Sequence, residues 1–194
     1  MVAKPKLTDA DIVRAATLLG VQVPALKAVL EVESPRGGFQ DDGQVSILFE
    51  PHKFSQYTGG RFDKSHPDLS YQKWGTRPYG SFASQHGKLQ RAVELDRDAA
   101  LEATSWGKPQ ILGKNWTAAG ASSLQDFINK MHSSEAAQLG LMVAFIRSQP
   151  EMLAALRRLD WDGFARRYNG SAYRVNQYHT KLATAHRKHA QVGA

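Results

Sequence analysis

The chain of 194 residues contains no cysteine. Disulfide bonds, thiolate metal sites and a cysteine nucleophile are therefore excluded. It also lacks a long apolar run, because the longest one lies around Leu139 to Ile146 and is far short of the ~20 residues that a membrane-spanning helix needs. We expect this run to form a buried helix. The first nine residues contain no apolar segment of the kind found in a secretory signal, so no signal peptide is expected.

Internal repeats, low-complexity tracts and linkers rich in Pro, Gly or Ser are absent too. The length is that of one ordinary domain and is sufficient to bury a hydrophobic core. Residues 1–194 are therefore expected to form a single domain.

Acidic residues are outnumbered by basic ones, 18 against 25, which gives a net charge of +7. Such a charge favours anionic partners, including nucleic acid, anionic membranes and anionic polymers. The excess is largest from residue 151 to the end, where eight Lys or Arg residues stand against three acids. The last helix is therefore expected to be basic.

The spacing of apolar residues predicts a mainly helical, α+β fold. Thr8 and Asp11 form a variant of the capping box, which predicts a first helix that ends at Gly20. A second helix is expected from about Pro24 to Ser34. Seven further helices are expected at Gln85–Arg97, Asp98–Thr104, Ser123–His132, Ser134–Gln149, Glu151–Leu159, Trp161–Tyr168 and Ala172–Ala190.

Two segments depart from the helical pattern. Between residues 38 and 50 a turn signal at Asp41-Asp42-Gly43 is followed by alternating apolar residues, which predicts a small β-hairpin. From Thr58 to Ser84 the sequence is rich in Gly, Pro, Ser and Tyr, so we expect a long ordered loop.

Glu33 occupies an unusual position in the second helix. With Leu26 placed at 0°, a rotation of about 100° per residue puts Val29 near 300° and Glu33 near 340°. Glu33 therefore lies within the apolar stripe, whereas Glu31 lies on the opposite face and is expected to pair with Lys27. Burial and the negative end of the helix dipole both raise the pKa of a carboxyl group.

A carboxylic acid that stays protonated near neutral pH suits the general acid of a glycosidase. The structural alternative is a Glu that reaches water at the helix end or forms a buried ion pair. Glycoside hydrolysis usually needs a second carboxylate, for which Asp41, Asp42 and Glu50 are candidates. Simple turn chemistry is the alternative explanation for the two aspartates.

Several motifs together resemble the N-acetylmuramidase family of phage endolysins, in the lysozyme-like superfamily. They occur in the family's order and cover essentially the whole chain: Val32-Glu33-Ser34, Gly38-Phe39, Asp42-Gly43, Ile47-Leu48-Phe49-Glu50, Phe54, Thr58-Gly59-Gly60-Arg61-Phe62, Thr104-Ser105-Trp106-Gly107-Lys108-Pro109-Gln110-Ile111 and Tyr168-Asn169-Gly170. The sequence departs from the family at Pro35-Arg36, where small residues are frequent.

This resemblance implies a lysozyme-like fold and cleavage of the β-1,4 bond between N-acetylmuramic acid and N-acetylglucosamine in peptidoglycan. It maps the catalytic acid onto Glu33 and the catalytic aspartate onto Asp42, although the neighbouring Asp41 leaves that choice open. It implies no cofactor. No separate cell-wall-binding domain is expected.

The resemblance also implies a set of residues that line the substrate cleft. Gly107 and Gln110 look like the Gly-x-x-Gln element of lysozyme-like enzymes, in which Gln110 would contact an N-acetyl group. Trp106 offers a face for a sugar ring or is a core residue, and Ser105 would orient the second carboxylate or a water. Tyr168 and Asn169 line the cleft wall, end a helix, or do both.

Two other functions would use parts of the same sequence. A lytic transglycosylase needs Glu33 alone and leaves 1,6-anhydro ends. A basic binding module would use the last helix on an anionic membrane or wall, but it leaves Glu33 unexplained. His186 and His189 suggest no metal site. We expect a monomer that does not bind nucleic acid and that stays in the host cytoplasm until it is released to the wall in the periplasm.

Overall fold

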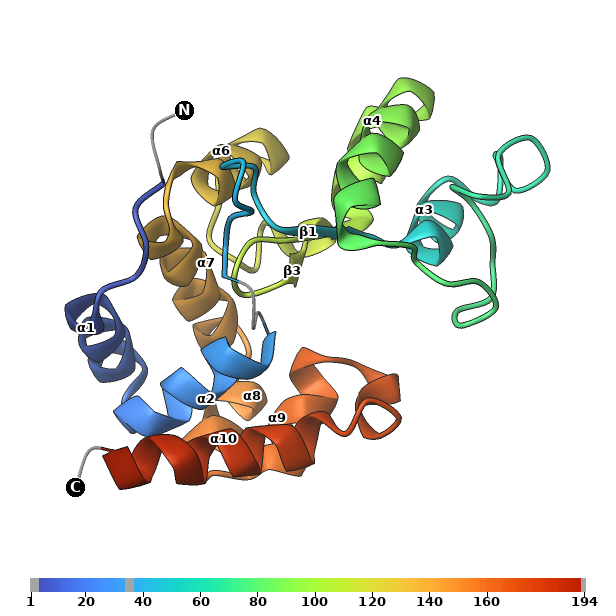
Figure 1. Ribbon diagram of the computed structural model, residues 1–194. Helices are drawn as coiled ribbons and strands as arrows, with labels where there is room; N and C mark the ends of the chain where they lie inside the picture. The colour runs from blue at the N-terminus through green and yellow to red at the C-terminus, as the bar shows by residue number, and fades with distance from the viewer. Residues whose placement is uncertain (1–3, 34–36, 193–194) are drawn as a thin grey trace.

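A computed structural model describes residues 4–33 and 37–192. Figure 1 shows a helical part that contains the two chain ends, and a second part that contains the sheet. The elements in chain order are α1 Asp9–Leu19, α2 Val23–Glu33, β1 Ile47–Phe49, α3 Pro51–Tyr57, α4 Gln85–Leu95, α5 Arg97–Glu102, β2 Thr104–Trp106, β3 Ile111–Leu112, α6 Leu124–Ser133, α7 Glu135–Arg147, α8 Pro150–Arg157, α9 Trp161–Tyr168 and α10 Tyr178–Val192. The mainly helical, α+β fold is confirmed.

Helix α1 begins and ends where its capping residues predict. The backbone N–H of Asp11 donates to Thr8 Oγ1 at 3.2 Å, and the Thr8 N–H donates to Asp11 Oδ2 at 2.9 Å. Gly20 closes the helix with a φ of 63°, in the left-handed region that glycine adopts readily. Helix α2 is described as far as Glu33, and its expected last residue, Ser34, lies outside the described residues.

Helix α7 forms the centre of the core, as its apolar sequence predicts. Its buried residues point to all sides, so the helix is enclosed by its neighbours rather than amphipathic. They include Leu139, Leu141, Met142, Phe145 and Ile146. Helices α1, α6 and α8 pack against it. In the described part of the chain, no single helix is both long and apolar enough to cross a membrane.

The β-structure differs from the expected hairpin. The turn is present, with one bridge between Phe39 and Val45. However, β1 pairs with β2 instead, with Leu48 opposite Ser105, and β3 completes an antiparallel sheet of order β1-β2-β3. The predicted hairpin is therefore present around its turn, where the Ser46 N–H donates to the Gly38 carbonyl oxygen at 2.9 Å. The partner of the strand that follows was not predicted, because local alternation indicates a strand but not a partner 57 residues away.

The region after β1 contains a short helix, α3, that the sequence pattern did not predict. The segment from residue 58 to 84 is mainly turns, as expected, and Figure 1 shows it projecting from the sheet side. Asp63 organises its base by accepting hydrogen bonds from Ser55 Oγ at 3.1 Å and Ser70 Oγ at 2.5 Å.

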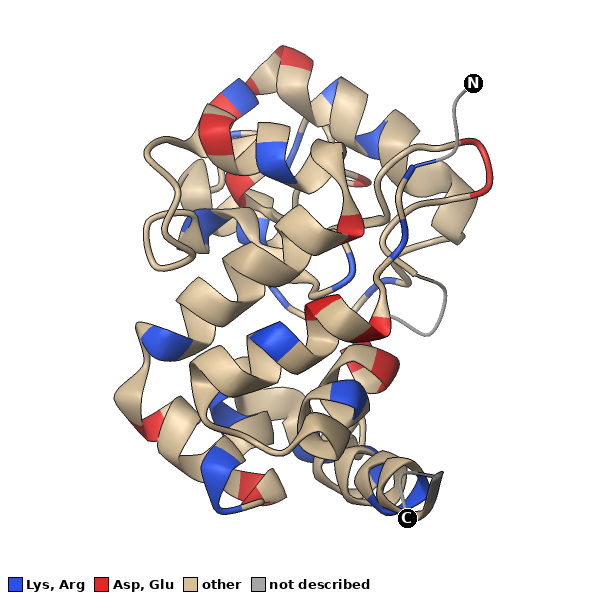
Figure 2. Ribbon diagram, turned by 90° about the vertical axis from the view of Figure 1, so that its left-hand side faces the viewer, with Lys and Arg blue, Asp and Glu red and all other residues tan. Residues whose placement is uncertain are grey.

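The C-terminal segment also differs from the predicted single helix. A 3-10 turn at Ser171–Arg174 and a left-handed Gln177, with φ of 54°, precede α10. Helix α10 then packs along α2. Figure 2 shows basic segments on this helix and on helices of both parts.

The packing of α10 on α2 changes the expected partner of Glu31. Its carboxylate pairs with Lys188 at 2.9 Å and His189 at 2.8 Å, both on α10. Lys27 instead pairs with Asp9 at 2.8 Å. The predicted pair between Lys27 and Glu31 was wrong, because the tertiary contact supplied closer partners than the helix surface did.

Candidate active site

Glu33 ends α2 at the point where the helix leaves the core. Leu26, Val29 and Leu30 on the same stripe are buried. Burial raises the pKa of the Glu33 carboxyl from 4.5 to about 7, against a smaller lowering by a hydrogen bond from Asn169. The shift has the direction that the helix projection predicts, and it keeps a large fraction of Glu33 protonated at neutral pH.

Asn169 supplies that hydrogen bond from the end of α9. Its Nδ2 donates to Glu33 Oε1 at 2.9 Å. Its own Oδ1 is buried and has no partner within residues 4–33 and 37–192. Because a buried amide oxygen normally accepts a hydrogen bond, this atom is suited to a donor brought by a ligand. Asn169 both ends a helix and faces the candidate acid.

Tyr168 precedes Asn169 and connects the end of α9 to another part of the chain. Its hydroxyl donates to the Pro109 carbonyl oxygen at 2.7 Å, which joins α9 to the turn after β2. Burial, and then the charge of Glu33, raise the pKa of the Tyr168 hydroxyl well above its ordinary value. Tyr168 therefore acts as a neutral hydrogen-bond donor to this turn.

The turn after β2 contains Gly107 and Gln110, which the sequence assigned to the cleft. Gly107 has φ of 65°, and a Cβ there would lie 2.7 Å from the Gln138 side chain. The Gln110 Nε2 donates to the Gly107 carbonyl oxygen at 2.8 Å. Gly107 is thus required by backbone conformation and packing, and Gln110 uses one of its donors within the turn itself.

Trp106 lies in the core. Its side chain is 2% exposed, and its Nε1 donates to the Leu101 carbonyl oxygen at 3.1 Å. It therefore does not present a face to a sugar ring, and the core alternative holds. Successive side chains of a strand point to opposite faces, so Trp106 points into the core and the neighbouring Ser105 points to the other face of β2.

Glu135 and Gln138, near the N-terminus of α7, hold the backbone at Gly38 and the turn after β2 in place. The sequence analysis did not single out these two residues. The buried Glu135 accepts hydrogen bonds from the backbone N–H of Gly38 at 2.6 Å and of Leu7 at 2.9 Å. Gln138 accepts from the Lys108 N–H at 2.8 Å and donates to the Gly38 carbonyl oxygen at 3.3 Å. In sequence, Glu135 resembles any acidic residue in a first helical turn.

Ser105 contacts a second carboxylate, that of Glu50. Its Oγ donates to Glu50 Oε1 at 2.9 Å. Glu50 follows β1, and its side chain is 18% exposed. Burial raises the pKa of Glu50, with smaller lowering effects from the Ser105 hydrogen bond and the charge of Lys53. Of the three carboxylates proposed from the sequence, Glu50 is the one that Ser105 orients.

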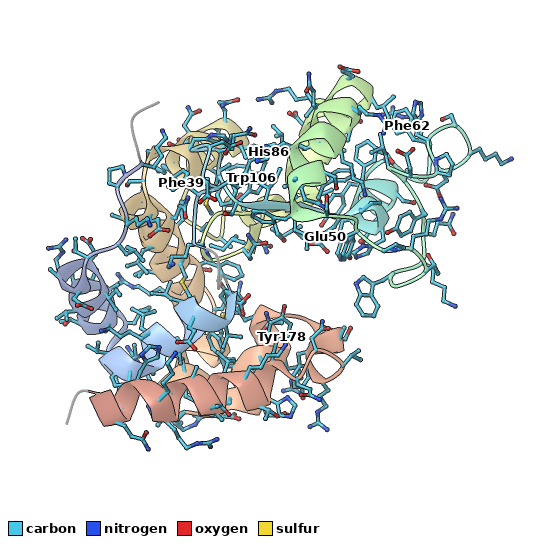
Figure 3. All side chains as sticks on the ribbon, in the orientation of Figure 1. Phe39, Glu50, Phe62, His86, Trp106 and Tyr178 are labelled. Atoms are coloured by element: carbon cyan, nitrogen blue, oxygen red, sulfur yellow. The ribbon has the colours of Figure 1, made fainter. Side chains whose placement is uncertain are left out.

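Tyr178, at the start of α10, lies within the electrostatic reach of both Glu33 and Glu50. Burial raises the pKa of its hydroxyl to about 12, and the charges of these two glutamates add to that shift. In Figure 3, Glu50 and Tyr178 come from the two parts of the molecule and lie on the sides that face each other. Sequence reasoning missed Tyr178, because it stands at a helix start without any distinctive motif.

Asp42 lies elsewhere, in the exposed turn of the hairpin. Both of its carboxylate oxygens accept hydrogen bonds from Gln44, at 2.9 Å from the backbone N–H and 2.8 Å from Nε2. Asp41 and Asp42 line an open hollow of about 490 Å³ with Phe39, Gln40 and Phe82. Figure 1 shows this turn near α6, at the far end of the hairpin from the end of α2. The contacts match the turn-chemistry alternative, and they do not bring Asp42 to Glu33.

Groups of three or more potential metal ligands do not occur among the described His, Asp and Glu residues. His186 packs its ring against Trp161 and lies 3.3 Å from Gln22 Oε1. His189 pairs with Glu31. Both histidines therefore serve the packing of α10.

Comparison with known proteins identifies the family of this chain. The family model of N-acetylmuramidase matches residues 22–190. The crystal structure of the Burkholderia AP3 phage endolysin is similar, with a TM-score of 0.85 and 40% sequence identity, over 97% of this chain and 72% of that one. No curated protein matches the chain. The chain belongs to the N-acetylmuramidase family and is a glycoside hydrolase that acts on peptidoglycan.

Proposed function

We propose that this enzyme hydrolyses the β-1,4 bond between N-acetylmuramic acid and N-acetylglucosamine, with Glu33 as general acid. The observation that carries the proposal is the raised pKa of Glu33, about 7, at a helix end where Asn169 holds the carboxyl group. A carboxylic acid of this pKa still carries its proton near neutral pH and loses it readily to a leaving alkoxide.

The proton moves from Glu33 to the glycosidic oxygen as the bond from C1 of N-acetylmuramic acid breaks. The sugar ring then carries the positive charge of an oxocarbenium-like transition state. The Oδ1 of Asn169, which has no partner among the described residues, would accept a hydrogen bond from the N–H of an N-acetyl group, which would place the scissile bond beside the acid. Once Glu33 is charged, the Asn169 donor stabilises its carboxylate.

The second carboxylate decides between hydrolysis and transglycosylation. A lytic transglycosylase needs Glu33 alone, because an oxygen of the substrate closes the 1,6-anhydro ring. A hydrolase adds water with the help of a second carboxylate. The resemblance assigned this role to Asp42, but its hydrogen bonds to Gln44 and its exposed turn give that residue little support.

Mass spectrometry of digested peptidoglycan tests the proposal. Wild type is expected to produce reducing N-acetylmuramic acid ends, and Glu33→Gln to lose at least about 100-fold in rate. Glu31→Gln is the matched control, because it makes the same change on the same helix at the surface ion pair with Lys188. Anhydro ends from wild type would show a transglycosylase, and full activity of Glu33→Gln would contradict the assignment of the acid.

We propose that the biological role is lysis of a bacterial host by a phage. This rests on the similarity to a phage endolysin. The enzyme would act as a monomer, accumulate in the host cytoplasm and reach the wall after a separate membrane lesion. Expression in bacteria should leave cells intact until the inner membrane is permeabilised, and lysis should then require Glu33. Lysis of cells with intact membranes would contradict this route.

A further inference from the structure

The first described residues, 4–8, form neither helix nor strand, yet their backbone is fixed to the start of α7. The Leu7 N–H donates to Glu135 Oε2 at 2.9 Å, and the Pro5 carbonyl oxygen accepts from the Glu135 N–H at 3.2 Å. The second bond satisfies one of the N–H groups that a helix start leaves without an intrahelical partner. Figure 1 shows the segment passing α7 on its way to α1. Glu135 thus holds this segment with both its backbone and its side chain.

Glu135 uses its other carboxylate oxygen to hold the chain that follows α2. Its Oε1 accepts a hydrogen bond from the Gly38 N–H at 2.6 Å, and Lys108 Nζ lies 3.9 Å from the same oxygen. The Glu135 side chain is 7% exposed, so water does not readily replace a lost partner. The two oxygens of a carboxylate are rigidly joined. Displacement of Leu7 at one oxygen therefore displaces the carboxylate that Gly38 contacts at the other.

Lys4 gives the N-terminal segment a second contact with the same part of the chain. Its Nζ lies 5.9 Å from the centre of the Phe39 ring, within the range of a cation–π interaction. Because Phe39 directly follows Gly38, residues 4–7 reach two adjacent residues beyond α2. The Leu7 side chain also packs against the hydrophobic core. Residues 4–7 therefore form an N-terminal strap across this part of the molecule.

Gln138 extends the connection to the turn after β2. It lies three residues after Glu135 on α7 and is fully buried. Its Nε2 donates to the Gly38 carbonyl oxygen at 3.3 Å, and its Oε1 accepts from the Lys108 N–H at 2.8 Å. Glu135 and Gln138 therefore contact the same two segments, at Gly38 and at Lys108. Both segments are fixed twice to the start of α7.

The turn after β2 is connected to the carboxyl group of Glu33. Pro109 follows Lys108, and its carbonyl oxygen accepts a hydrogen bond from the Tyr168 hydroxyl at 2.7 Å. Asn169 is the next residue and donates to Glu33 Oε1 at 2.9 Å. Coupling between distant groups needs a contiguous physical network. The hydrogen bonds from the strap to the candidate acid form such a network.

We propose that the N-terminal strap positions the active site and that Glu135 is the positioning residue through which it acts. This inference rests on the proposed role of Glu33 as the general acid. Without the Leu7 donor, the Glu135 carboxylate loses one of the two N–H groups that fix it, and the turn after β2 moves relative to α9. The bond from Asn169 to Glu33 then weakens. The strap precedes residues 22–190, which the family model matches, so its contacts are not part of what defines the family.

The test compares Leu7→Pro with Leu7→Ala, its matched control. Both variants lose the leucine side chain, but only proline lacks the N–H that donates to Glu135. On purified peptidoglycan, the kcat of Leu7→Pro should be about 10-fold below that of Leu7→Ala, because the acid is misplaced. The KM values should agree within about two-fold, since the strap does not contact the substrate. Each assay is run well below the melting temperature of the variant.

Glu135→Gln breaks the same contact from the other side, since an amide keeps one acceptor oxygen and replaces the other with a donor. Its kcat should also fall about 10-fold, and the addition of Leu7→Pro should lower it little further. Glu151→Gln is the matched control, because it makes the same change in the first turn of α8, where the side chain is 79% exposed. Its kcat should equal that of wild type. If the two single losses multiplied in the double variant, the route through Glu135 would be refuted.

The alkaline limb of kcat against pH is a readout that a purely structural role would not move, because it reports the acid. Burial raises the pKa of Glu33, and the hydrogen bond from Asn169 offsets part of that rise. A weaker bond therefore moves the limb to higher pH. The limb should move in this direction in Leu7→Pro and Glu135→Gln and stay in place in the two control variants.

Equal kcat and an equal alkaline limb in Leu7→Pro and Leu7→Ala would overturn the proposal, whatever their melting temperatures. A lower kcat of Leu7→Pro with an unmoved limb would also overturn it, because the strap would then act without Glu33. Full activity of Glu33→Gln would instead contradict the proposed acid, while the ratio of kcat between the two Leu7 variants would still report on the strap. The two failures are thus distinguishable.

Discussion

The amide nitrogen of Asn169 lies 2.9 Å from Oε1 of Glu33 and donates a hydrogen bond to it, across 136 residues of sequence. Burial raises the pKa of this glutamate, and the hydrogen bond limits the rise. The two effects together set a pKa of about 7, which is low enough for release of the proton and high enough for its retention at neutral pH.

Removal of the Asn169 donor should shift the activity to higher pH. In Asn169→Ala, nothing offsets the burial of Glu33, so the alkaline limb of kcat against pH should move upward. The rate at its optimum should also fall about 10-fold or more, because the N-acetyl contact is lost. Asn176→Ala, in the exposed segment before α10, is the control. An unchanged alkaline limb would show that Asn169 does not act on the acid.

The raised pKa of Glu33 also predicts the pH dependence of stability. The folded state binds the Glu33 proton more tightly than the unfolded state, in which the pKa is near 4.5. Its contribution to the free energy of unfolding is therefore full below about pH 4.5 and is lost as pH rises through about 7.

Urea unfolding of wild type and Glu33→Gln at pH 4.5 and at pH 8 measures this contribution. The lower pH equals the pKa of Glu33 in the unfolded chain. The difference in unfolding free energy between the two proteins should change by up to about 3 kcal/mol, with Glu33→Gln relatively more stable at the higher pH. A difference independent of pH would mean that Glu33 titrates normally.

Gly107→Ala should be strongly destabilising. The added Cβ meets Gln138 at 2.7 Å, and the φ of 65° is unfavourable for alanine. The expected loss in unfolding free energy is about 2–4 kcal/mol. Gly87→Ala, on α4 with open space around its Cα, should instead stabilise by up to about 1 kcal/mol. Similar melting temperatures for the two variants would contradict this account of the turn.

The basic α10 helix should assist attachment to the anionic wall or membrane. Neutralising Arg187 and Lys188 as glutamines should weaken wall binding about 10-fold at low salt, with cleavage of a short soluble substrate unchanged. Because Lys188 pairs with Glu31, Glu31→Gln should have the opposite effect on binding. Co-sedimentation with insoluble walls over a range of salt concentrations checks this, and equal binding by all three proteins would refute it.

The position of Glu33 was predictable because helix periodicity is local. Four residues of one stripe, read at a fixed rotation, suffice to place a carboxylate among apolar neighbours. Asn169 and Ser105 were found through the resemblance to a family, but their partners were not. Glu50 was one of three candidates in sequence, and its hydrogen bond from Ser105 depends on the pairing of β1 with β2.

The sequence by itself determined the helical fold, the caps of the first helix and the candidate acid, because each depends on residues within a few turns of one another. Only the tertiary structure decided that Trp106 is a core residue, that Asp42 serves its own turn, and that Ser105 donates a hydrogen bond to Glu50. These facts depend on contacts between residues far apart in the chain. Such contacts decide which side chains are buried, and burial in turn shifts the pKa of a titratable group.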